Sequence, residues 1–453
     1  MTPGTRVAII GAGIAGMGCA WALHRSGAHV TVYEREPEIG GNAKTHTWRV
    51  DGREIVTGLS VLAWPDALFH NYEALLAELG VAVEMAPTLR FFIKDGASIF
   101  AQGLATQGFE ADLRRWDKLV AFVRRVNGSL ASDKTPSLYE YSPLNPLLVF
   151  PLRRLAKLFG ISTRFWERVF VPIHSSSFLT VELDGVPASI APSIEDIVSL
   201  EHGARLRTWS GSSREVFVRL SKGFEERIYR ATTVARVRRA REGIAIETSA
   251  GAEASFDRVV FACNPHAALR MLEPPSLLER TLLGGIEYPD TTDPTFLRGV
   301  AHSDVTVLPE EHRRTILDGF ANFLELSDAD GRLRYENTFV LSSWVPTARG
   351  QGLPMMVSYN RRDLPKSPER TISNEWAHPC LSSSNLARAW LLRATQGRAA
   401  TYWCGSYATP GNGHDLSLLS GLVVAKALGA EYPFAQNAAA RADFQRLSRF
   451  MLG

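Results

Sequence analysis

Cysteine is scarce in this chain of 453 residues, and the few cysteines that it has are scattered. They lie at positions 19, 263, 380 and 404, and no two are separated by only two residues. This spacing excludes a disulfide framework, a zinc site of the usual kind and a dithiol redox motif, so we expect no metal site. Cysteines used so sparingly fit a reducing compartment, and we expect a cytoplasmic protein.

Long apolar runs and a strong excess of one charge are also missing. The N-terminal apolar run is too short for a signal peptide, and no run reaches the 18 or so apolar residues of a membrane-spanning helix. Basic residues number 50 and acidic residues 47, which gives a net charge of +3. A chain so evenly charged gives no reason to expect nucleic acid as a partner. Nothing in the sequence indicates an oligomeric state.

A glycine-rich motif, GAGIAG, directly follows the first short apolar, β-branched run. Gly11 allows a tight turn from strand to helix, and Gly13 lets the backbone approach a pyrophosphate. Gly16 lets the following helix pack closely on the strand. The helix would begin near Ile14 and Ala15, where its free N–H groups and positive dipole end favour phosphate.

A second strand, in which Val30 and Val32 alternate with polar residues, completes the βαβ unit. It ends at Glu34, 18 residues after Gly16, and Arg35 follows. An acidic side chain at about this spacing accepts hydrogen bonds from the ribose of a dinucleotide. The alternative is an ordinary βαβ turn, for which every part of the unit would have to match by accident. We therefore predict a dinucleotide-binding domain.

A glycine pair, Gly40-Gly41, stands shortly after the second strand. It lets the backbone approach a diphosphate a second time. This arrangement resembles the FAD-binding half of the amine oxidase, protoporphyrinogen oxidase and phytoene desaturase superfamily. In that superfamily an arginine often follows the pair, whereas this chain has Asn42. The resemblance implies that Asn42 lies at the cofactor and that Lys44 compensates phosphate charge.

Further segments resemble the same superfamily in the same order along the chain. Gly58 and Leu59 occupy the place of a glycine turn near the flavin ring. Val234 begins a strand whose backbone would touch the adenine. Ala262 and Cys263 follow a later strand, at the sheet edge where ligands of α/β proteins bind, although Cys263 taken alone favours an ordinary buried thiol.

The last matching segment is a strand, a glycine-rich loop and a helix between residues 400 and 430. Gly405 and Ser406 follow the strand, and Ser406 replaces the acidic residue usual in the superfamily. Gly413 precedes a helix that begins at His414 and Asp415, whose N-terminus would face the flavin edge where negative charge develops on reduction. His414 is the one candidate for a catalytic side chain, and a helix-capping role explains it equally well.

The resemblance implies an α/β fold, a Rossmann-type FAD-binding domain of the glutathione-reductase kind with a discontinuous α+β substrate domain. The details are most similar to bacterial predicted FAD/NAD-binding flavoproteins related to a polyunsaturated fatty acid double-bond isomerase. The FAD domain would comprise residues 1–90, 215–275 and 395–433. The substrate domain would comprise residues 91–214 and 276–394, and residues 434–453 would form a C-terminal helix.

The resemblance implies FAD as cofactor and a small hydrophobic, unsaturated substrate, fatty-acyl or polyene-like, that exchanges hydride with flavin N5. Because the chain has no second GxGxxG motif, reduced flavin would pass its electrons to oxygen or another acceptor. A redox-neutral double-bond isomerase and an amine oxidase are the alternative enzymes, and a non-catalytic flavin carrier is a third. Apolar stretches at 139–180 and 339–359 predict a substrate tunnel, which core packing would explain as well.

Two features of the predicted substrate domain leave alternatives open. Basic amphipathic helices expected at 111–126 and 147–161 suit either peripheral contact with an anionic membrane or an ordinary solvated surface. His174, and His302 with Asp304, read either as proton carriers or as satisfied structural groups.

Overall fold

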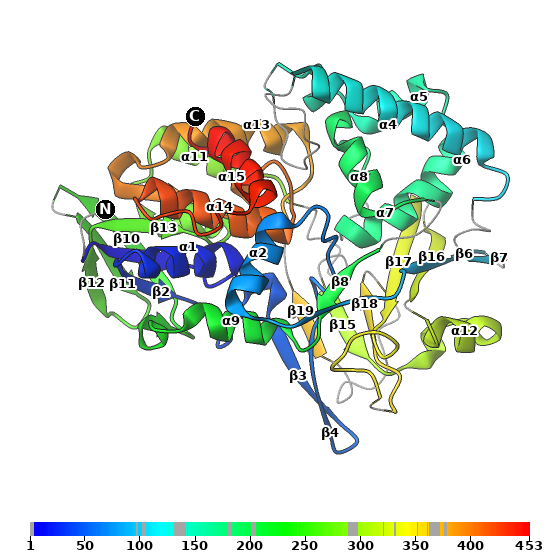
Figure 1. Cartoon of the computed structure of the whole chain (residues 1–453), viewed down its shortest axis with the longest axis horizontal. Helices are drawn as coiled ribbons and strands as arrows, with labels where there is room; N and C mark the ends of the chain where they lie inside the picture. The colour runs from blue at the N-terminus through cyan, green and yellow to red at the C-terminus, as the bar shows by residue number, and fades with distance from the viewer. Residues whose placement is uncertain are drawn as a thin grey trace.

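The computed structural model describes most of the chain, and Figure 1 gives the arrangement of its elements. The described residues are 4–96, 98–101, 106–130, 142, 144–178, 183–200, 205–241, 243–288, 298–319, 321–329, 332–350, 352–359, 361, 372–375 and 378–453.

A five-stranded parallel sheet forms the centre of one half of the molecule. Its order is β20 (Thr401–Trp403), β13 (Arg258–Phe261), β1 (Arg6–Ile10), β2 (His29–Tyr33) and β9 (Ile228–Tyr229). All neighbouring strands run parallel. The interior strands are apolar along nearly their whole length because helices and loops cover both faces.

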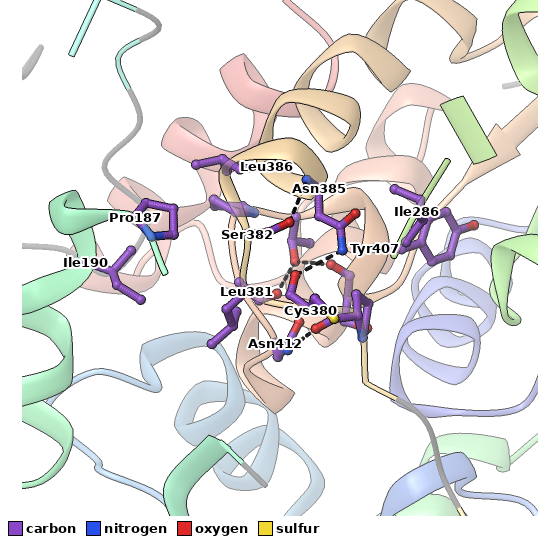
Figure 2. A pocket seen from close by; sticks show the side chains of 15 residues that line it. Pro187, Ile190, Ile286, Cys380, Leu381, Ser382, Asn385, Leu386, Tyr407 and Asn412 are labelled. Atoms are coloured by element: carbon purple, nitrogen blue, oxygen red, sulfur yellow. Dashed lines mark hydrogen bonds between the residues drawn. The ribbon is translucent and has the colours of Figure 1, made fainter. Parts of the chain in front are cut away.

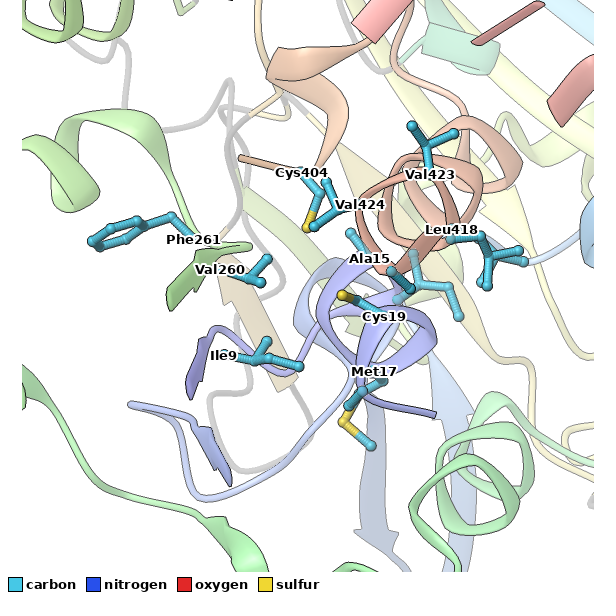
Figure 3. Close-up of a cluster of buried hydrophobic side chains, with 14 of the residues drawn as sticks. Ile9, Ala15, Met17, Cys19, Val260, Phe261, Cys404, Leu418, Val423 and Val424 are labelled. Atoms are coloured by element: carbon cyan, nitrogen blue, oxygen red, sulfur yellow. The ribbon is translucent and has the colours of Figure 1, made fainter. Parts of the chain in front are cut away.

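Helix α1 (Ile14–Arg25) and helix α14 (His414–Ala427) cross on this sheet at very short range. A Cβ built on Gly421 would lie 2.1 Å from the carbonyl oxygen of Ala15, and one on Gly18 would lie 2.5 Å from Leu418. Figure 3 shows Cys19 of α1 and Leu418 of α14 in one apolar cluster with side chains of the sheet. The crossing holds the start of the chain against a helix from its last tenth.

Smaller elements complete this half. A four-stranded sheet has the order β12 (Glu253–Phe256), β11 (Gly243–Thr248), β10 (Val234–Ala240) and β14 (Leu272–Glu273), in which β10, β11 and β12 form an antiparallel meander. The surrounding helices are α2 (His70–Leu79), α9 (Ser213–Ser221), α10 (Pro265–Met271), α11 (Leu277–Gly284), α13 (Ser383–Leu391) and α15 (Ala438–Met451).

A mixed seven-stranded sheet organises the other half. Its order is β19 (Ile372–Glu375), β15 (Arg298–His302), β18 (Met356–Tyr359), β17 (Arg332–Val340), β16 (Ala321–Ala329), β6 (Arg90–Asp95) and β7 (Ser98–Ala101). Its helices are α4 (Glu110–Leu130), α5 (Leu152–Leu158), α6 (Thr163–Phe165), α7 (Val171–Phe178), α8 (Ala191–Ile197) and α12 (Arg313–Leu317). Two ribbons, β3 (Thr45–Val50) with β4 (Arg53–Gly58) and β5 (Val83–Met85) with β8 (Arg207–Trp209), lie between the halves (Figure 1).

Each half has its own apolar core. One core joins residues from the start, the middle and the end of the chain, and the other joins residues between 48 and 359. The α/β fold with a Rossmann-type sheet and a second, discontinuous α+β half is therefore as expected. The predicted domain boundaries themselves stay a prediction.

One local expectation was wrong. The helix expected from Leu147 to Ile161 is interrupted, because Pro151 lacks the N–H of a helix interior and caps the seven-residue α5 instead. No helix in the described part of the chain is long and apolar enough to cross a membrane.

Candidate cofactor and substrate site

The glycines of the first loop are fixed by different constraints. Gly11 has a φ of +107°, and a Cβ on it would lie 2.7 Å from the carbonyl oxygen of Ala262. A Cβ on Gly16 would lie 2.0 Å from the Gly11 carbonyl oxygen, so this position serves helix packing. A Cβ on Gly13 would lie 3.9 Å from the nearest atom around it, the Cα of Gly41. Open space therefore lies before the N-terminus of α1, where Ile14 and Ala15 begin the helix.

The glycine pair lies against this loop, as its predicted role requires. The Gly40 N–H donates to the carbonyl of Ala12 at 2.9 Å, and Gly40 pairs with Gly13 as an isolated parallel bridge. Gly40 and Gly41 both have positive φ, and a Cβ on Gly41 would press on Gly13 at 3.1 Å. The two glycine-rich segments thus form one cradle of backbone groups with little side-chain bulk.

Glu34, Arg35 and Lys44 around the cradle already have partners. Glu34 accepts from the Ala12 N–H at 2.8 Å and from the Glu36 N–H at 2.9 Å, which leaves further lone pairs for hydroxyl donors. Lys44 is mostly buried, with its Nζ 3.9 Å from Glu36, while Arg35 is exposed and pairs with Glu36 at 3.1 Å. Asn42 lies on the short 3-10 turn Gly41–Ala43.

The neighbouring strand ends also converge on the cradle. The Ala262 N–H donates to the carbonyl of Ile10 at 2.9 Å, which places Ala262 and Cys263 beside the first loop. Burial raises the pKa of the Cys263 thiol to about 12. The thiol is therefore neutral, and it lines the site without acting as a nucleophile. Val234 is buried at the start of β10.

The C-terminal segment approaches from β20. Gly405 has a φ of +119°, and its N–H donates to Ser420 Oγ of α14 at 2.8 Å. Ser406 begins a 3-10 turn, and Gly413 caps α14 without a side chain. Asp415 was expected to bind the cofactor, but its buried carboxylate accepts from the Tyr72 N–H at 2.5 Å. The Asp415 side chain therefore ties α14 to α2.

A cavity of about 260 Å³ opens at the N-terminus of α14. Its walls come from residues 60–69, from α8, from the β17–β18 region and from the loop 410–416. Large apolar and aromatic side chains prevail, among them Phe339, Trp344 and Tyr359. Gly58 and Leu59 lead into this wall, and the Leu59 carbonyl accepts a hydrogen bond from the Tyr359 hydroxyl.

Two histidines from distant parts of the sequence line the cavity, His378 and His414. Burial lowers the pKa of His378 to about 4 and that of His414 to about 3, so both imidazoles are neutral at pH 7. Nε2 of His378 is buried and has no hydrogen-bond partner among the described residues. His414 packs edge-on against the Tyr72 ring, with centroids 4.7 Å apart.

A hydrogen bond joins the two segments that carry these histidines, because Asn412 donates through Nδ2 to the carbonyl of Pro379 at 2.7 Å (Figure 2). On the His378 side, Asn385 of α13 donates to the carbonyl of Cys380 at 3.0 Å. Sequence reasoning missed His378, because no motif surrounds it and only the fold brings it to residues 410–416.

The other candidate histidines lie away from the cavity. His174 is fully buried among aromatic rings, and His302 contacts Ser358 at 2.8 Å and the backbone N–H of Asp304 at 3.2 Å. The Asp304 carboxylate instead caps the next turn through the Thr306 N–H at 3.0 Å, so His302 and Asp304 are not an acid–base pair. Of the two apolar stretches, 339–359 contributes to the cavity wall, whereas none of the described residues of 139–180 lines it.

Comparison with known proteins matches this geometry. Residues 9–79 match the family model of the NAD(P)-binding Rossmann-like domain. Phytoene dehydrogenase of Streptomyces griseus is 33% identical over 103 residues, 21% of this chain and 19% of that protein. The small chain of glutamate synthase [NADPH] of Escherichia coli (strain K12) is 58% identical over 38 residues, 8% of each chain. The chain thus spans less than a fifth of the length of these relatives.

Solved structures match over nearly the whole chain. Putrescine oxidase has a TM-score of 0.67 at 14% identity, covering 94% of this chain and 99% of the other. A conjugated-linoleic-acid-producing (CLA-producing) fatty acid isomerase from P. acnes has a TM-score of 0.63 at 17% identity, covering 93% and 98%. Cyclohexylamine oxidase from Brevibacterium oxydans has a TM-score of 0.64 at 16% identity, covering 94% and 100%. This chain therefore has the fold of these three enzymes, and a Rossmann-like domain lies in its N-terminal part.

Proposed function

We propose that this chain is an FAD-dependent oxidoreductase that moves hydride between flavin N5 and a hydrophobic, unsaturated substrate of the fatty-acyl or polyene kind. The observation that carries the proposal is the position of the apolar cavity, which opens at the N-terminus of α14. This helix is locked to α1, and α1 begins at the dinucleotide loop. One ligand that reaches from the cradle to α14 would end beside the cavity.

The residues present fit FAD. The open space at Gly13, the paired Gly40-Gly41 and the N-terminus of α1 suit a pyrophosphate. The partly exposed Glu34 carboxylate suits ribose hydroxyls. FAD would supply the hydride acceptor, while this chain orients the substrate and excludes water from it.

The cavity wall suits a hydrocarbon better than a charged substrate. Aromatic and aliphatic groups form most of the described lining, and its two titratable imidazoles, His378 and His414, stay neutral. A neutral imidazole can donate or accept one hydrogen bond without the cost of a buried charge. These two side chains would orient a polar group of the substrate or of the flavin.

A redox-neutral double-bond isomerase is the second candidate. The structural similarity to a fatty acid isomerase supports it, and so does the lack of a second GxGxxG motif for a nicotinamide reductant. Hydride would leave one carbon of the substrate and return to another, in the same cavity. An amine oxidase, the activity named for two of the similar structures, is the third candidate.

Anaerobic turnover tests these candidates. The purified protein is first examined for flavin absorbance and then mixed under nitrogen with unsaturated fatty acids, a carotenoid precursor or amines. We expect a polyunsaturated or polyene substrate to bleach the flavin, and amines to leave it oxidised. Continued turnover without an acceptor would identify the isomerase, and a single flavin reduction the oxidase or desaturase. A protein that stays colourless after reconstitution with FAD would refute all three.

A further inference from the structure

The outer helices of the second half carry a cluster of exposed apolar side chains. Figure 1 shows α4, α5 and α6 along the outer edge of the second half. Val149 is 72% exposed and Leu158 75%, while Phe122 is 41% exposed and packs against Phe159 with ring centroids 5.6 Å apart. Leu144, 80% exposed, lies in the same segment. Such large apolar groups gain nothing from contact with water.

Exposed basic side chains lie on the same two helices. On α4, Lys118 and Arg125 are one turn to either side of Phe122, so the three side chains share a helix face. On α5, Arg154 and Lys157 precede Leu158. All four bases are exposed, and none forms an ion pair with another described residue. The acidic group among them is Asp117, the exposed neighbour of Lys118.

Three other bases on these helices have acidic partners within the fold. Arg124 pairs with Asp196 of α8 at 2.6 Å, Arg115 lies 3.6 Å from Asp112, and Arg153 lies 3.7 Å from Glu167. The bases that flank the exposed apolar groups have no such partner among the described residues, and neither does the exposed Arg114, one turn before Lys118. We name the surface formed by Lys118, Phe122, Arg125, Val149, Arg154, Lys157 and Leu158 the α4–α5 face.

We propose that the α4–α5 face docks on an anionic lipid bilayer. Apolar tips that enter the interface and bases that meet lipid headgroups are the two components that hold a peripheral protein on such a membrane. The proposal does not rest on the flavin chemistry. Docking by this face would bring the cavity near substrate dissolved in the membrane. Helix α4 packs on α8, and Ile194, Ile197 and Val198 of the α8 segment line the cavity.

Co-sedimentation with vesicles tests the electrostatic component. The protein is mixed with vesicles of phosphatidylcholine alone, or of phosphatidylcholine with phosphatidylglycerol, at low and high salt. We expect binding to the anionic vesicles only, weakened by salt. Each base removed should weaken it about fivefold. The variant for this arm is Lys118→Gln/Arg125→Gln/Arg154→Gln/Lys157→Gln, and its control, with four exposed bases elsewhere, is Lys222→Gln/Arg241→Gln/Arg280→Gln/Arg314→Gln.

A second pair of variants tests the apolar component. We expect Val149→Ser/Leu158→Ser to weaken binding to the anionic vesicles about tenfold or more. The matched control is Val218→Ser/Leu277→Ser, which removes exposed apolar groups of α9 and α11, 59% and 79% exposed. Flavin content and activity on dispersed substrate should be unchanged in all four variants, which separates this proposal from the proposed function.

Three results would overturn the proposal. The first is binding that is equal on neutral and anionic vesicles, or absent from both. The second is a control variant that loses as much binding as its partner. The third is a dimer in light scattering that the α4–α5 variants dissociate, since the face would then be covered by a second copy of the chain.

Discussion

His174 offers a sharp test of how burial governs stability in the helical core of the second half. The side chain is fully buried on α7, with its ring 4.4 Å from Phe170 and 6.5 Å from Trp116 between centroids. Neither ring nitrogen has a hydrogen-bond partner among the described residues. A buried polar group left unsatisfied costs about 1–3 kcal/mol. We therefore expect His174→Leu to raise the free energy of unfolding by about this amount at pH 7.5.

The same substitution should change the acid sensitivity of the protein. Burial lowers the pKa of His174 from 6.5 to about 3. Above pH 6.5 the imidazole is neutral in both states, but below it the unfolded chain gains a proton that the folded chain cannot hold. The wild type therefore loses about 1.4 kcal/mol of stability for each pH unit below 6.5, or about 2 kcal/mol at pH 5. The leucine variant is free of this loss.

Urea titration followed by tryptophan fluorescence, at pH 7.5 and pH 5.0, measures both effects. The difference in unfolding free energy between His174→Leu and wild type should widen by about 2 kcal/mol on going to pH 5.0. His29→Leu, at an exposed histidine, is the control and should show no such widening. A variant less stable than wild type at pH 7.5, or a difference independent of pH, would refute the reasoning.

The remaining predictions concern the cofactor, a carboxylate and the cavity. Gly13→Val should abolish FAD retention with little change in the unfolding midpoint of the apoprotein, because its side chain enters the open space of the cradle. In Gly16→Ala the added Cβ would lie 2.0 Å from backbone, so the apoprotein midpoint should fall, and equal midpoints would contradict this. Burial raises the pKa of Glu195 to about 7, so its stabilising effect is full below pH 4.5 and lost as pH rises through 7. Glu195→Gln should then stabilise by about 2 kcal/mol at pH 8.5 and hardly at pH 4.5 in urea titrations, and equal gains at both would count against it. His378→Leu should lower substrate turnover tenfold or more with normal flavin absorbance, whereas unchanged kinetics would remove His378 from substrate binding.

Sequence reasoning was most informative where the chemistry of the backbone is local. The cradle needs glycine at Gly11 and Gly16 because any side chain would strike backbone, and such constraints leave a motif. The order of segments along the chain then predicted which strands share the Rossmann-type sheet. The predicted contacts of these residues with FAD stay a prediction.

The cavity could be predicted only in part. The apolar stretch 339–359, which includes Trp344, was expected to line a substrate tunnel and does contribute to the cavity wall. His378 and the α8 residues join it only through tertiary packing, and neither has a neighbour in sequence that signals its role. Asp415 has a structural role that its position at a helix start did not indicate, because its carboxylate accepts a hydrogen bond from α2. Its predicted contact with the cofactor stays a prediction. The long helix expected at 147–161 is interrupted at Pro151. Hydrophobic periodicity alone does not reveal such an interruption.

The strand order of the Rossmann-type sheet has a consequence for synthesis of the protein. Strand β1 lies between β2 and β13, and the sheet is not complete until β20 pairs at residues 401–403. A ribosome therefore synthesises more than half of the chain before β1 has both its neighbours, and nearly all of it before the sheet is complete. Contacts between residues so far apart in sequence form slowly, and the exposed sheet edge promotes aggregation until β20 pairs. Truncation near the C-terminus should therefore affect yield of the whole protein, and not only the helix that is removed.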